Sequence, residues 1–253
     1  MDKPKIITFD LETSPLVAYS WGPKWDTKLI EIIDQSMILS YSAKWLGGKH
    51  ITKGWIDYEG YKKGNKNDKE IVKDIWKLFD EADIIVVQNG KAFDTKSVNS
   101  RFIYYHLPPP SPYKIVDTLL ENRKLLRMPS YSLDDICAYY DIGRKQEHEG
   151  FGLWKKCMAG DEQAWKRMLR YNKHDVTLTE QLYLLVRPYM KAHPNLGNYQ
   201  NKVVCPKCSS MDVQFRGYYF GATTQYRKFV CKNCGAWSRT THNVQKIKPL
   251  AII

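Results

Sequence analysis

The sequence predicts a mixed α/β domain followed by a small basic domain rich in cysteine. Between residues 6 and 186, short apolar segments with strand character alternate with helical segments. Beyond that region, four of the six cysteines form two CxxC pairs. The net charge of the chain is +12. Residues 195–253 contain nine Lys or Arg and one acid, Asp212, so this segment carries a charge of +8 and the remaining residues carry +4. We therefore expect one domain at 1–194 and a second at 195–253.

The order of elements predicts a mixed sheet of about five strands with helices on both faces. A first strand covers 6–13, and an irregular connection comes next over 15–33. Residues 37–46 and 50–58 are expected to form a hairpin with Gly47 and Gly48 at its turn. Two further strands are expected at 83–89 and 113–118, and helices at 68–82, 93–105, 118–126, 132–140 and 161–186.

The first strand, IITFDLET, ends with two carboxylates, Asp10 and Glu12. Side chains two apart on a strand point to the same face, so these acids would be neighbours. Like charges at a half-buried site require compensation, either by a bound divalent cation or by a strongly raised pKa. The alternative is that the strand ends at Phe9 and both acids lie in a solvated loop.

Two other places in the chain also put acids at the ends or faces of apolar elements. After the strand at 83–89, the chain turns through Asn89 and Gly90 and reaches Asp94 near a helix start. On the last helix, Tyr171 and Asp175 are four residues apart and share a face.

These three segments resemble the motifs of a known nuclease family. The pattern DxE at 10–12, Asn-x-x-x-Phe-Asp at 89–94 and YxxxD at 171–175 is similar to the motifs of ribonuclease H-like, DnaQ-type DEDD 3′-5′ exonucleases. The tyrosine marks the DEDDy branch, because the histidine branch would carry His where this chain has Arg170. The resemblance covers about residues 5–190.

The resemblance implies a two-metal phosphodiesterase that removes nucleoside monophosphates from the 3′ end of single-stranded nucleic acid, with DNA favoured over RNA. Two Mg²⁺ or Mn²⁺ ions, which prefer carboxylate ligands, would activate water and neutralise phosphate charge. Asp10 would bridge both ions, Glu12 and Asp175 would hold the ion on the nucleophile side, and Asp94 the other ion, largely through water. Tyr171 would orient the attacking water.

Other residues near these motifs have a structural and a functional interpretation. Asn89 either makes the turn or contacts substrate. Trp21 and Trp25 either stack on the terminal base or pack the connection after the first strand against the core. Asp117, Asp134 and Asp135 are expected to be structural or capping residues, and His148 a solvated loop residue.

The two CxxC pairs, Cys205 with Cys208 and Cys231 with Cys234, predict a zinc ribbon with one structural Zn²⁺. Four thiolates suit a tetrahedral zinc site, and in a reducing compartment disulfides, the alternative, would not persist. The remaining cysteines, at 137 and 157, are expected to be packing residues.

Aromatic residues alternate with basic residues through this ribbon, which is too small to bury so many rings. Exposed rings can stack on unpaired bases while the cations meet phosphates. Alternatively, the ribbon docks onto the larger domain or onto another protein. The candidate contacts with nucleic acid are Tyr218, Tyr219, Arg227, Lys228 and Trp237.

The sequence therefore favours a soluble, cytoplasmic exonuclease that binds single-stranded DNA or RNA and could associate with replication or repair proteins. It has no secretory signal pattern and no run of about 18 apolar residues, so no membrane association is expected. A catalytically retired adaptor would have lost a carboxylate, and all four are present. A structure-specific endonuclease would differ by cutting a circular single strand.

Overall fold

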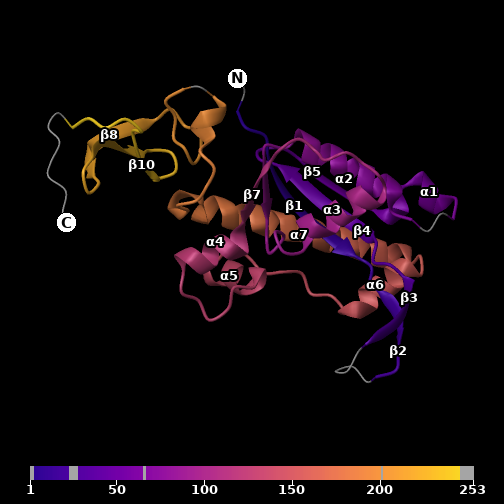
Figure 1. The fold of residues 1–253 in the computed structure, drawn as a ribbon. Helices are drawn as coiled ribbons and strands as arrows, with labels where there is room; N and C mark the ends of the chain where they lie inside the picture. The colour runs from indigo at the N-terminus through magenta and orange to yellow at the C-terminus, as the bar shows by residue number, and fades with distance from the viewer. Residues whose placement is uncertain (1–2, 23–27, 65–66, 201, 246–253) are drawn as a thin grey trace. The chain divides into compact units, whose positions relative to one another are not determined.

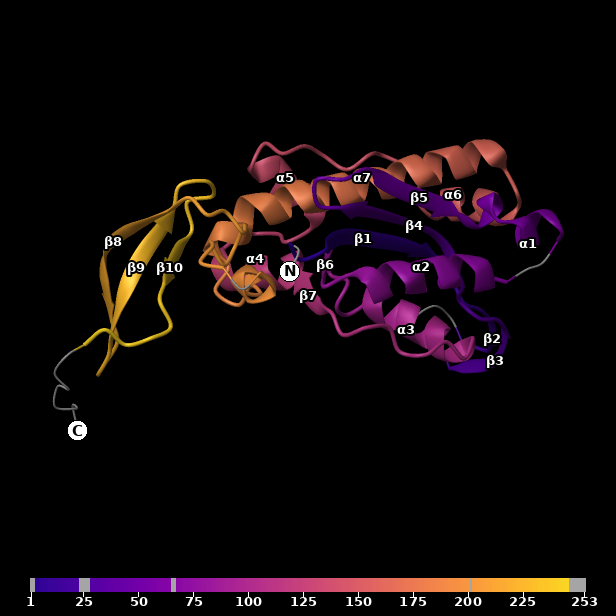
Figure 2. The same ribbon diagram turned by 90° about the horizontal axis from the view of Figure 1, so that it is seen from above.

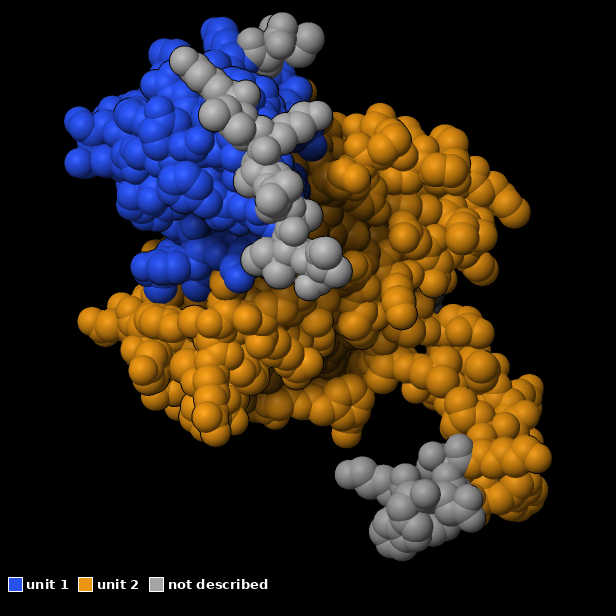
Figure 3. Space-filling view, turned by 60° about the vertical axis from the view of Figure 1, so that its left-hand side comes forward, with its two compact units in different colours: residues 1–4, 183–253 blue, residues 5–182 orange. Residues whose placement is uncertain are grey.

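The computed structural model describes residues 3–22, 28–64, 67–200 and 202–245 (Figure 1). The chain divides into two compact units, residues 5–182 and residues 183–253 with residues 1–4 (Figure 3). The division lies inside a long helix, α7 (Glu162–Val186), whereas the sequence predicts a domain boundary after residue 194.

The larger unit contains the predicted mixed five-stranded sheet, with the order β5-β4-β1-β6-β7. β1 pairs antiparallel with β4 and parallel with β6; β4 and β5 are antiparallel, and β6 and β7 are parallel. β6 has the sequence IIVV and is buried at every position, as expected for a central strand covered on both faces. The strands are β1 (Ile6–Thr13), β4 (Ile38–Trp45), β5 (His50–Gly54), β6 (Ile84–Val87) and β7 (Lys114–Asp117).

The five predicted helices are present, with ends within a few residues of those expected. They are α2 (Lys69–Glu81), α3 (Asp94–Tyr104), α4 (Thr118–Leu125), α5 (Leu133–Tyr139) and α7. None of the helices in the described residues is long and apolar enough to cross a membrane.

Three short helical segments of the larger unit are absent from the predicted set. α6 (Phe151–Met158) begins where a polar loop is expected; Gly150 precedes it with φ 61°, and Leu153 and Cys157 on its inner face are fully buried. The 3₁₀ turn η1 (Trp55–Asp57) and the four-residue α1 (Glu59–Lys62) interrupt the end of the predicted hairpin, so β5 stops at Gly54.

Helices cover both faces of the sheet, with α2 and α3 on one side and α7 on the other (Figure 2). On the first side, Ile71, Ile75 and Phe79 of α2 pack in one cluster with Phe9 and Leu11 of β1. On the second side, residues of β4, α6 and α7 pack together, including Leu39, Cys157, Trp165 and Met168. The first cluster fixes β1 against α2, and the second fixes the neighbouring strand β4 against α6 and α7.

The predicted irregular connection after the first strand is wrong. Residues of this segment form a separate two-stranded antiparallel sheet, β2 (Val17–Ser20) with β3 (Leu29–Asp34), which projects beyond the main sheet in Figure 1. β-branched and aromatic residues, which favour strands, are frequent in both segments: Val17 and Tyr19 in β2, and Ile30, Ile32 and Ile33 in β3. Every residue of β3 is exposed, so the strands are held by backbone pairing rather than by burial.

The smaller unit begins with the last turn of α7, because this turn is hydrogen-bonded to the segment after the helix. The Tyr183 hydroxyl and His193 Nε2 are 2.8 Å apart, and the Leu196 amide donates to the Pro206 carbonyl at 2.9 Å. The 3₁₀ turns η2 (Arg187–Tyr189) and η3 (Leu196–Tyr199) precede a three-stranded antiparallel sheet. We call this sheet and the four cysteines beside it the cysteine ribbon; its strands are β8 (Val213–Phe220), β9 (Gln225–Cys231) and β10 (Trp237–Arg239).

A buried ion pair joins three elements of the larger unit. Asp68, fully buried just before α2, accepts hydrogen bonds from Arg101 Nε at 2.8 Å and from the Tyr105 hydroxyl at 2.6 Å, and it is ion-paired with Arg101. It also accepts from the Ile38 amide of β4 at 2.9 Å. The carboxylate therefore links α2, α3 and β4.

We expect Asp68→Ala to lower the free energy of unfolding by about 3–5 kcal/mol, because it leaves the largely buried Arg101 guanidinium without its partner. Equilibrium urea unfolding measures this loss. Glu59→Ala is the control, since it removes the exposed Glu59–Lys62 pair and should change the free energy by about 0.5 kcal/mol or less. Equal effects of the two substitutions would contradict the structural role of Asp68.

Candidate active site

β1 carries both of its carboxylates inside the sheet. The strand continues to Thr13, so the alternative in which it ends at Phe9 is wrong. Phe9 and Leu11 are buried in the core cluster, and the alternation of the strand turns Asp10 and Glu12 to the opposite face, where both are partly buried. The apolar residues therefore fix the direction of the acids.

Asp94 occupies the edge of β1 that β6 leaves open. The parallel pairing of β1 with β6 ends at Thr8 and Val86, and the chain then turns away from the sheet. Beyond that point the Leu11 amide donates to Asp94 Oδ1 at 3.1 Å. A carboxylate thus replaces a strand as the acceptor, which brings Asp94 beside Asp10 and Glu12.

The turn before α3 is shaped to admit Asp94. Asn89 has φ 60°, and its amide donates to Asp117 Oδ1 at 3.0 Å, while the Lys91 amide donates to Asp117 Oδ2 at 2.9 Å. A Cβ at Gly90 would come within 2.7 Å of Asp94 Oδ2, so only glycine leaves this carboxylate its space. The expected structural role of Asp117, which also caps α4, is confirmed.

α7 contributes Asp175 and, one turn earlier, Tyr171; both are buried. Between them, Asn172 is fully buried, and its side-chain amide donates to Asp10 Oδ2 at 2.5 Å. This residue holds one carboxylate of β1 in place from the helix. The sequence contains a signal for it, because an amide stands three residues before Asp175 and therefore on nearly the same helix face.

Lys145 reaches the acidic cluster from the polar loop before α6. Its Nζ lies 2.6 Å from Asp175 Oδ2 and 4.9 Å from the centre of the Tyr171 ring. The other oxygen of Asp175, Oδ1, is buried and has no hydrogen-bond partner in the described structure. Nothing in the loop's sequence distinguishes this lysine, since the segment has no periodicity.

Other rings surround Tyr171. The His148 ring centre lies 4.7 Å from that of Tyr171, and the Trp154 ring centre lies 6.5 Å from it. His148 is exposed, as expected, but its ring also packs against that of Tyr171. His174 faces elsewhere, with its Nε2 hydrogen-bonded to the Arg144 carbonyl at 2.7 Å.

The electrostatics of the cluster favour a bound cation. Burial, followed by the charges of Asp94, Glu12 and Asp175, raises the pKa of Asp10 well above its usual value. Burial and the Asp175 charge raise the pKa of Glu12 to about 8, and burial raises that of Asp94 to about 7. Burial also raises the pKa of Asp175, although Lys145 opposes this shift. Each carboxylate is therefore difficult to ionise without positive charge nearby.

The donor set suits hard divalent cations. The oxygens of Asp10, Glu12, Asp94 and Asp175 are all carboxylate oxygens, the ligands that such ions prefer. Asp175 Oδ1 is buried without a hydrogen-bond partner in the described structure. The four cysteines of the smaller unit have ligand atoms that all lie within 4.8 Å of one another. No three carboxylates among the described residues are grouped so tightly.

A pocket of about 450 Å³ opens beside the carboxylates. Asp10, Lys145 and Asp175 line it, and so does Asn89, which therefore both makes the turn and faces the pocket. The volume is within the range of small-ligand sites. The remaining wall is formed by Gln88, Leu119, Arg123, Ser130, Tyr131, Ser132 and Leu133.

The two tryptophans predicted to flank the site have different outcomes. Trp21 follows β2 and is 92% exposed, so it does not pack against the core, and it is absent from the residues that line the pocket. Trp25 lies outside the described residues.

The four ribbon cysteines form a group suited to zinc. The Sγ atoms of Cys205 and Cys234 are 3.7 Å apart, and those of Cys208 and Cys231 are 3.6 Å apart. Zn–S bonds of about 2.3 Å in a tetrahedron require a separation of about 3.8 Å. The Lys207 amide donates to Cys205 Sγ, as expected for a thiolate. By contrast, the cysteines at 137 and 157 are fully buried in the larger unit, as predicted for packing residues.

The predicted nucleic-acid contacts of the ribbon lie on two faces of its sheet. Tyr218 pairs with Arg227, and the neighbouring Tyr219 pairs with Tyr226, so the two tyrosines point to opposite sides. The Arg227 guanidinium lies over Phe215 on one face. On the other face, Lys228 lies over Trp237. The candidate residues therefore do not form a single surface.

The chain matches the RNase_H superfamily over residues 40–187, a range that includes Asp94 and Asp175 and begins after β1. It is also similar to a solved family B DNA polymerase from the hyperthermophilic archaeon Pyrobaculum calidifontis, with a TM-score of 0.51 and 17% sequence identity. The similarity covers 74% of this chain and 25% of the polymerase chain, so the chain spans about a quarter of the polymerase's length. No curated protein sequence matches the chain.

The raised carboxyl pKa values predict that the protein without added Mg²⁺ or Mn²⁺ is more stable at pH 6 than at pH 8.5. As the pH falls through about 8 and then 7, the folded state takes up protons at Glu12 and Asp94 that the unfolded state does not yet bind, so the free energy of unfolding rises. Thermal unfolding of the wild type and of Glu12→Gln measures the effect. The variant should melt at a higher temperature than wild type at pH 8.5 and should respond less to acidification; parallel pH profiles would contradict the assignment.

Proposed function

The chain belongs to the ribonuclease H superfamily, and we propose that it is a metal-dependent 3′-5′ exonuclease of the DnaQ-like tyrosine branch. One observation carries the proposal: carboxylates from β1, α3 and α7 interact around the end of β1 and raise one another's pKa values. A binding adaptor gains nothing from so unfavourable a grouping of acids. The substrate is single-stranded nucleic acid, and the products are nucleoside monophosphates.

Two Mg²⁺ or Mn²⁺ ions, held by Asp10, Glu12, Asp94 and Asp175, would supply a nucleophilic water and neutralise charge on the phosphate. Hydrogen bonds from neighbouring groups of the chain orient these carboxylates. Asn172 fixes Asp10 through a hydrogen bond, and the Leu11 amide fixes Asp94. Ligands held by buried groups on a strand and two helices need little rearrangement before reaction.

Tyr171 and Lys145 act beside these ligands. The Tyr171 side chain, buried one turn before Asp175, positions the attacking water by hydrogen bonding; burial raises its pKa, which makes it a poor base at neutral pH. The Lys145 ammonium gives the pocket a positive charge that attracts the phosphodiester. Asn89 and Tyr131 on the pocket wall contact the terminal nucleotide.

The cysteine ribbon binds one structural Zn²⁺ through Cys205, Cys208, Cys231 and Cys234 and holds the strand that the larger unit degrades. Its basic and aromatic surface residues support this role, since stacking and phosphate contacts bind single strands without sequence preference. The preference for DNA over RNA rests on the resemblance of the three motifs to DnaQ-type exonucleases.

The function is tested with purified protein, Mg²⁺ and 5′-labelled single-stranded DNA and RNA of the same sequence. We expect the DNA to shorten progressively from its 3′ end, and the Asp10→Asn variant to lose this activity because it removes a metal ligand. A circular single strand is the control for endonuclease activity and should remain intact. Cleavage of the circle, or full activity of Asp10→Asn, would contradict the proposal.

The role of Tyr171 is tested against that of His174, since both flank Asp175. Tyr171→Phe should slow cleavage by about 10- to 1000-fold, which corresponds to about 1.4–4 kcal/mol for one hydrogen bond made in the transition state. His174→Ala should have a much smaller effect, because that ring is bonded to the Arg144 carbonyl. Single-turnover rates compare the two, and the reverse order of effects would refute the tyrosine-branch assignment.

A further inference from the structure

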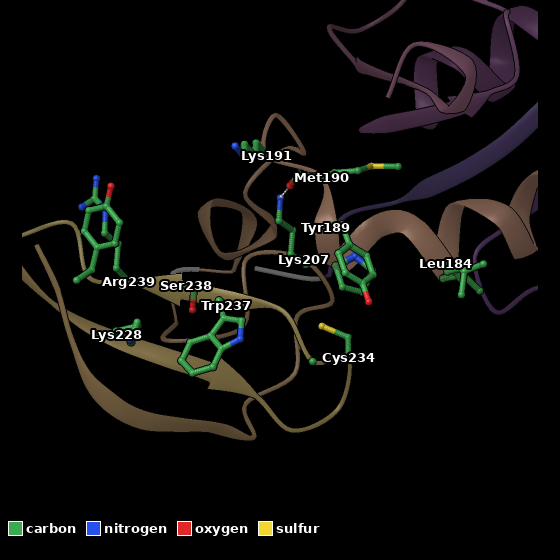
Figure 4. Close-up of a pocket in the computed structure, with 14 residues that line it drawn as sticks. Leu184, Tyr189, Met190, Lys191, Lys207, Lys228, Cys234, Trp237, Ser238 and Arg239 are labelled. Atoms are coloured by element: carbon green, nitrogen blue, oxygen red, sulfur yellow. Dashed lines mark hydrogen bonds between the residues drawn. The ribbon is translucent and has the colours of Figure 1, made fainter. Parts of the chain in front are cut away.

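A second pocket lies within the smaller unit, between the chain after α7 and one face of the cysteine ribbon (Figure 4). Its volume is about 1170 Å³. None of the described residues that line it is Asp or Glu. Three aromatic and three basic side chains carry the argument: Tyr189, Tyr219, Trp237, Lys191, Lys228 and Arg239.

The two walls of this pocket are held together by buried contacts. Lys207, next to the first CxxC pair, is nearly buried, and its ammonium donates to the Met190 carbonyl, as the dashed line in Figure 4 shows. The Tyr183–His193 hydrogen bond fixes the chain that leaves α7. The pocket is therefore part of the folded unit.

Two rings face the pocket with much of their surface uncovered. Tyr189 is 72% exposed and comes from η2, whereas Trp237 is 57% exposed and comes from β10. Figure 4 shows the two rings on different segments of the lining, Tyr189 on the chain after α7 and Trp237 on the cysteine ribbon. Large rings left open on both walls offer flat surfaces on which another planar group can stack.

The cations of the pocket lie beside its rings. Lys228 Nζ is 5.2 Å from the centre of Trp237. The Arg239 guanidinium is 3.9 Å from the centre of Tyr226 and 5.3 Å from that of Tyr219. With Lys191 on the other wall, the charges are placed to meet a polyanion whose flat groups lie on the rings.

We propose that this pocket binds single-stranded nucleic acid, with unpaired bases stacked on Tyr189 and Trp237 and phosphates bound by Lys191, Lys228 and Arg239. Unpaired bases expose both faces, which bases inside a duplex do not. An acidic peptide would satisfy the cations but would leave both ring faces uncovered. The inference rests on the nucleic-acid substrate of the proposed function and assigns strand binding to one face of the ribbon.

The opposite face of the ribbon provides matched controls. The sequence predicts Tyr218 as a contact with nucleic acid, but the present inference assigns it none, because it points away from the pocket and its ring centre lies 5.6 Å from that of Phe215. It neighbours Tyr219 on β8 and has similar exposure, 44% against 48%. Phe220, at the end of β8, is 71% exposed, close to the 72% of Tyr189, and lies outside the pocket lining.

The test measures binding of a fluorescent single-stranded oligonucleotide to the full chain by anisotropy, in the Asp10→Asn background so that the strand is not degraded. Tyr189→Ala and Trp237→Ala should each weaken binding by about 5- to 150-fold, the loss expected for one stacked base. Tyr218→Ala and Phe220→Ala should stay within about twofold. Tyr189→Phe, which keeps the ring, should bind like the parent. Zinc content measured for every variant verifies that the ribbon is intact.

The contribution of charge is tested separately. Lys191→Gln should reduce the slope of log affinity against log salt by about 0.7, whereas Lys202→Gln, an exposed lysine of the same unit outside the pocket, should leave it unchanged. An oligonucleotide of abasic sites should bind weakly and respond little to Tyr189→Ala, because it has no bases to stack.

Several outcomes would overturn the inference. Equal losses in Tyr189→Ala and in the control variants would mean that binding is spread over the ribbon, and tight binding of an acidic peptide sensitive to Tyr189→Ala would identify a protein-docking site. If the wild type degrades DNA while the pocket variants bind like their controls, this inference fails and the proposed function stands. If the pocket variants lose binding but no cleavage occurs, the proposed function fails and this inference stands.

Discussion

The larger unit is organised around the mutual repulsion of carboxylates at the end of β1. Asp10 and Glu12 could relieve this repulsion by moving into solvent, but Phe9 and Leu11 on the other face of the strand are locked in the core. Asp94 is held by the Leu11 amide, and Asp10 is held by the fully buried Asn172. Hydrophobic packing thus maintains an electrostatic arrangement that is unfavourable by itself, as is common at sites that bind cations.

The acids of this arrangement are predictable because their positions follow local periodicity. Asp10 and Glu12 share a face by strand alternation, and Tyr171 and Asp175 share one by the pitch of a helix. Lys145 and its contact with Asp175 are not predictable in this way, because a loop with no periodic pattern carries the lysine across to α7. The β2–β3 sheet is likewise hard to predict, since its apolar residues pair without entering the core and so lack the burial that predictions of strands rely on.

The cysteine ribbon shows a different limit of sequence reasoning. The sequence shows the cysteine spacing typical of zinc sites and more aromatic residues than the ribbon can bury. It does not show on which face of the sheet each aromatic side chain lies. Simple alternation places Phe215 and Tyr219 together. A bulge between Phe215 and Tyr218, where Gly217 has φ 80°, shifts the register, so Phe215 lies instead with Tyr218 and Arg227. One inserted residue therefore decides which aromatic groups meet the pocket.

The ion pair between Lys145 and Asp175 gives the carboxylate cluster a resident counterion. Although burial disfavours charge on Lys145, Asp175 outweighs it and raises the pKa of the ammonium, so this side chain stays protonated at neutral pH. A divalent ion that takes Asp175 as a ligand must then compete with the ammonium, which leaves by rotation of a flexible stem and not by loss of a proton. If the proposed metal dependence holds, binding of a metal ion would exchange one cation for another: the ion would replace the Lys145 ammonium at Asp175, and the carboxylates would keep a positive charge beside them in both states.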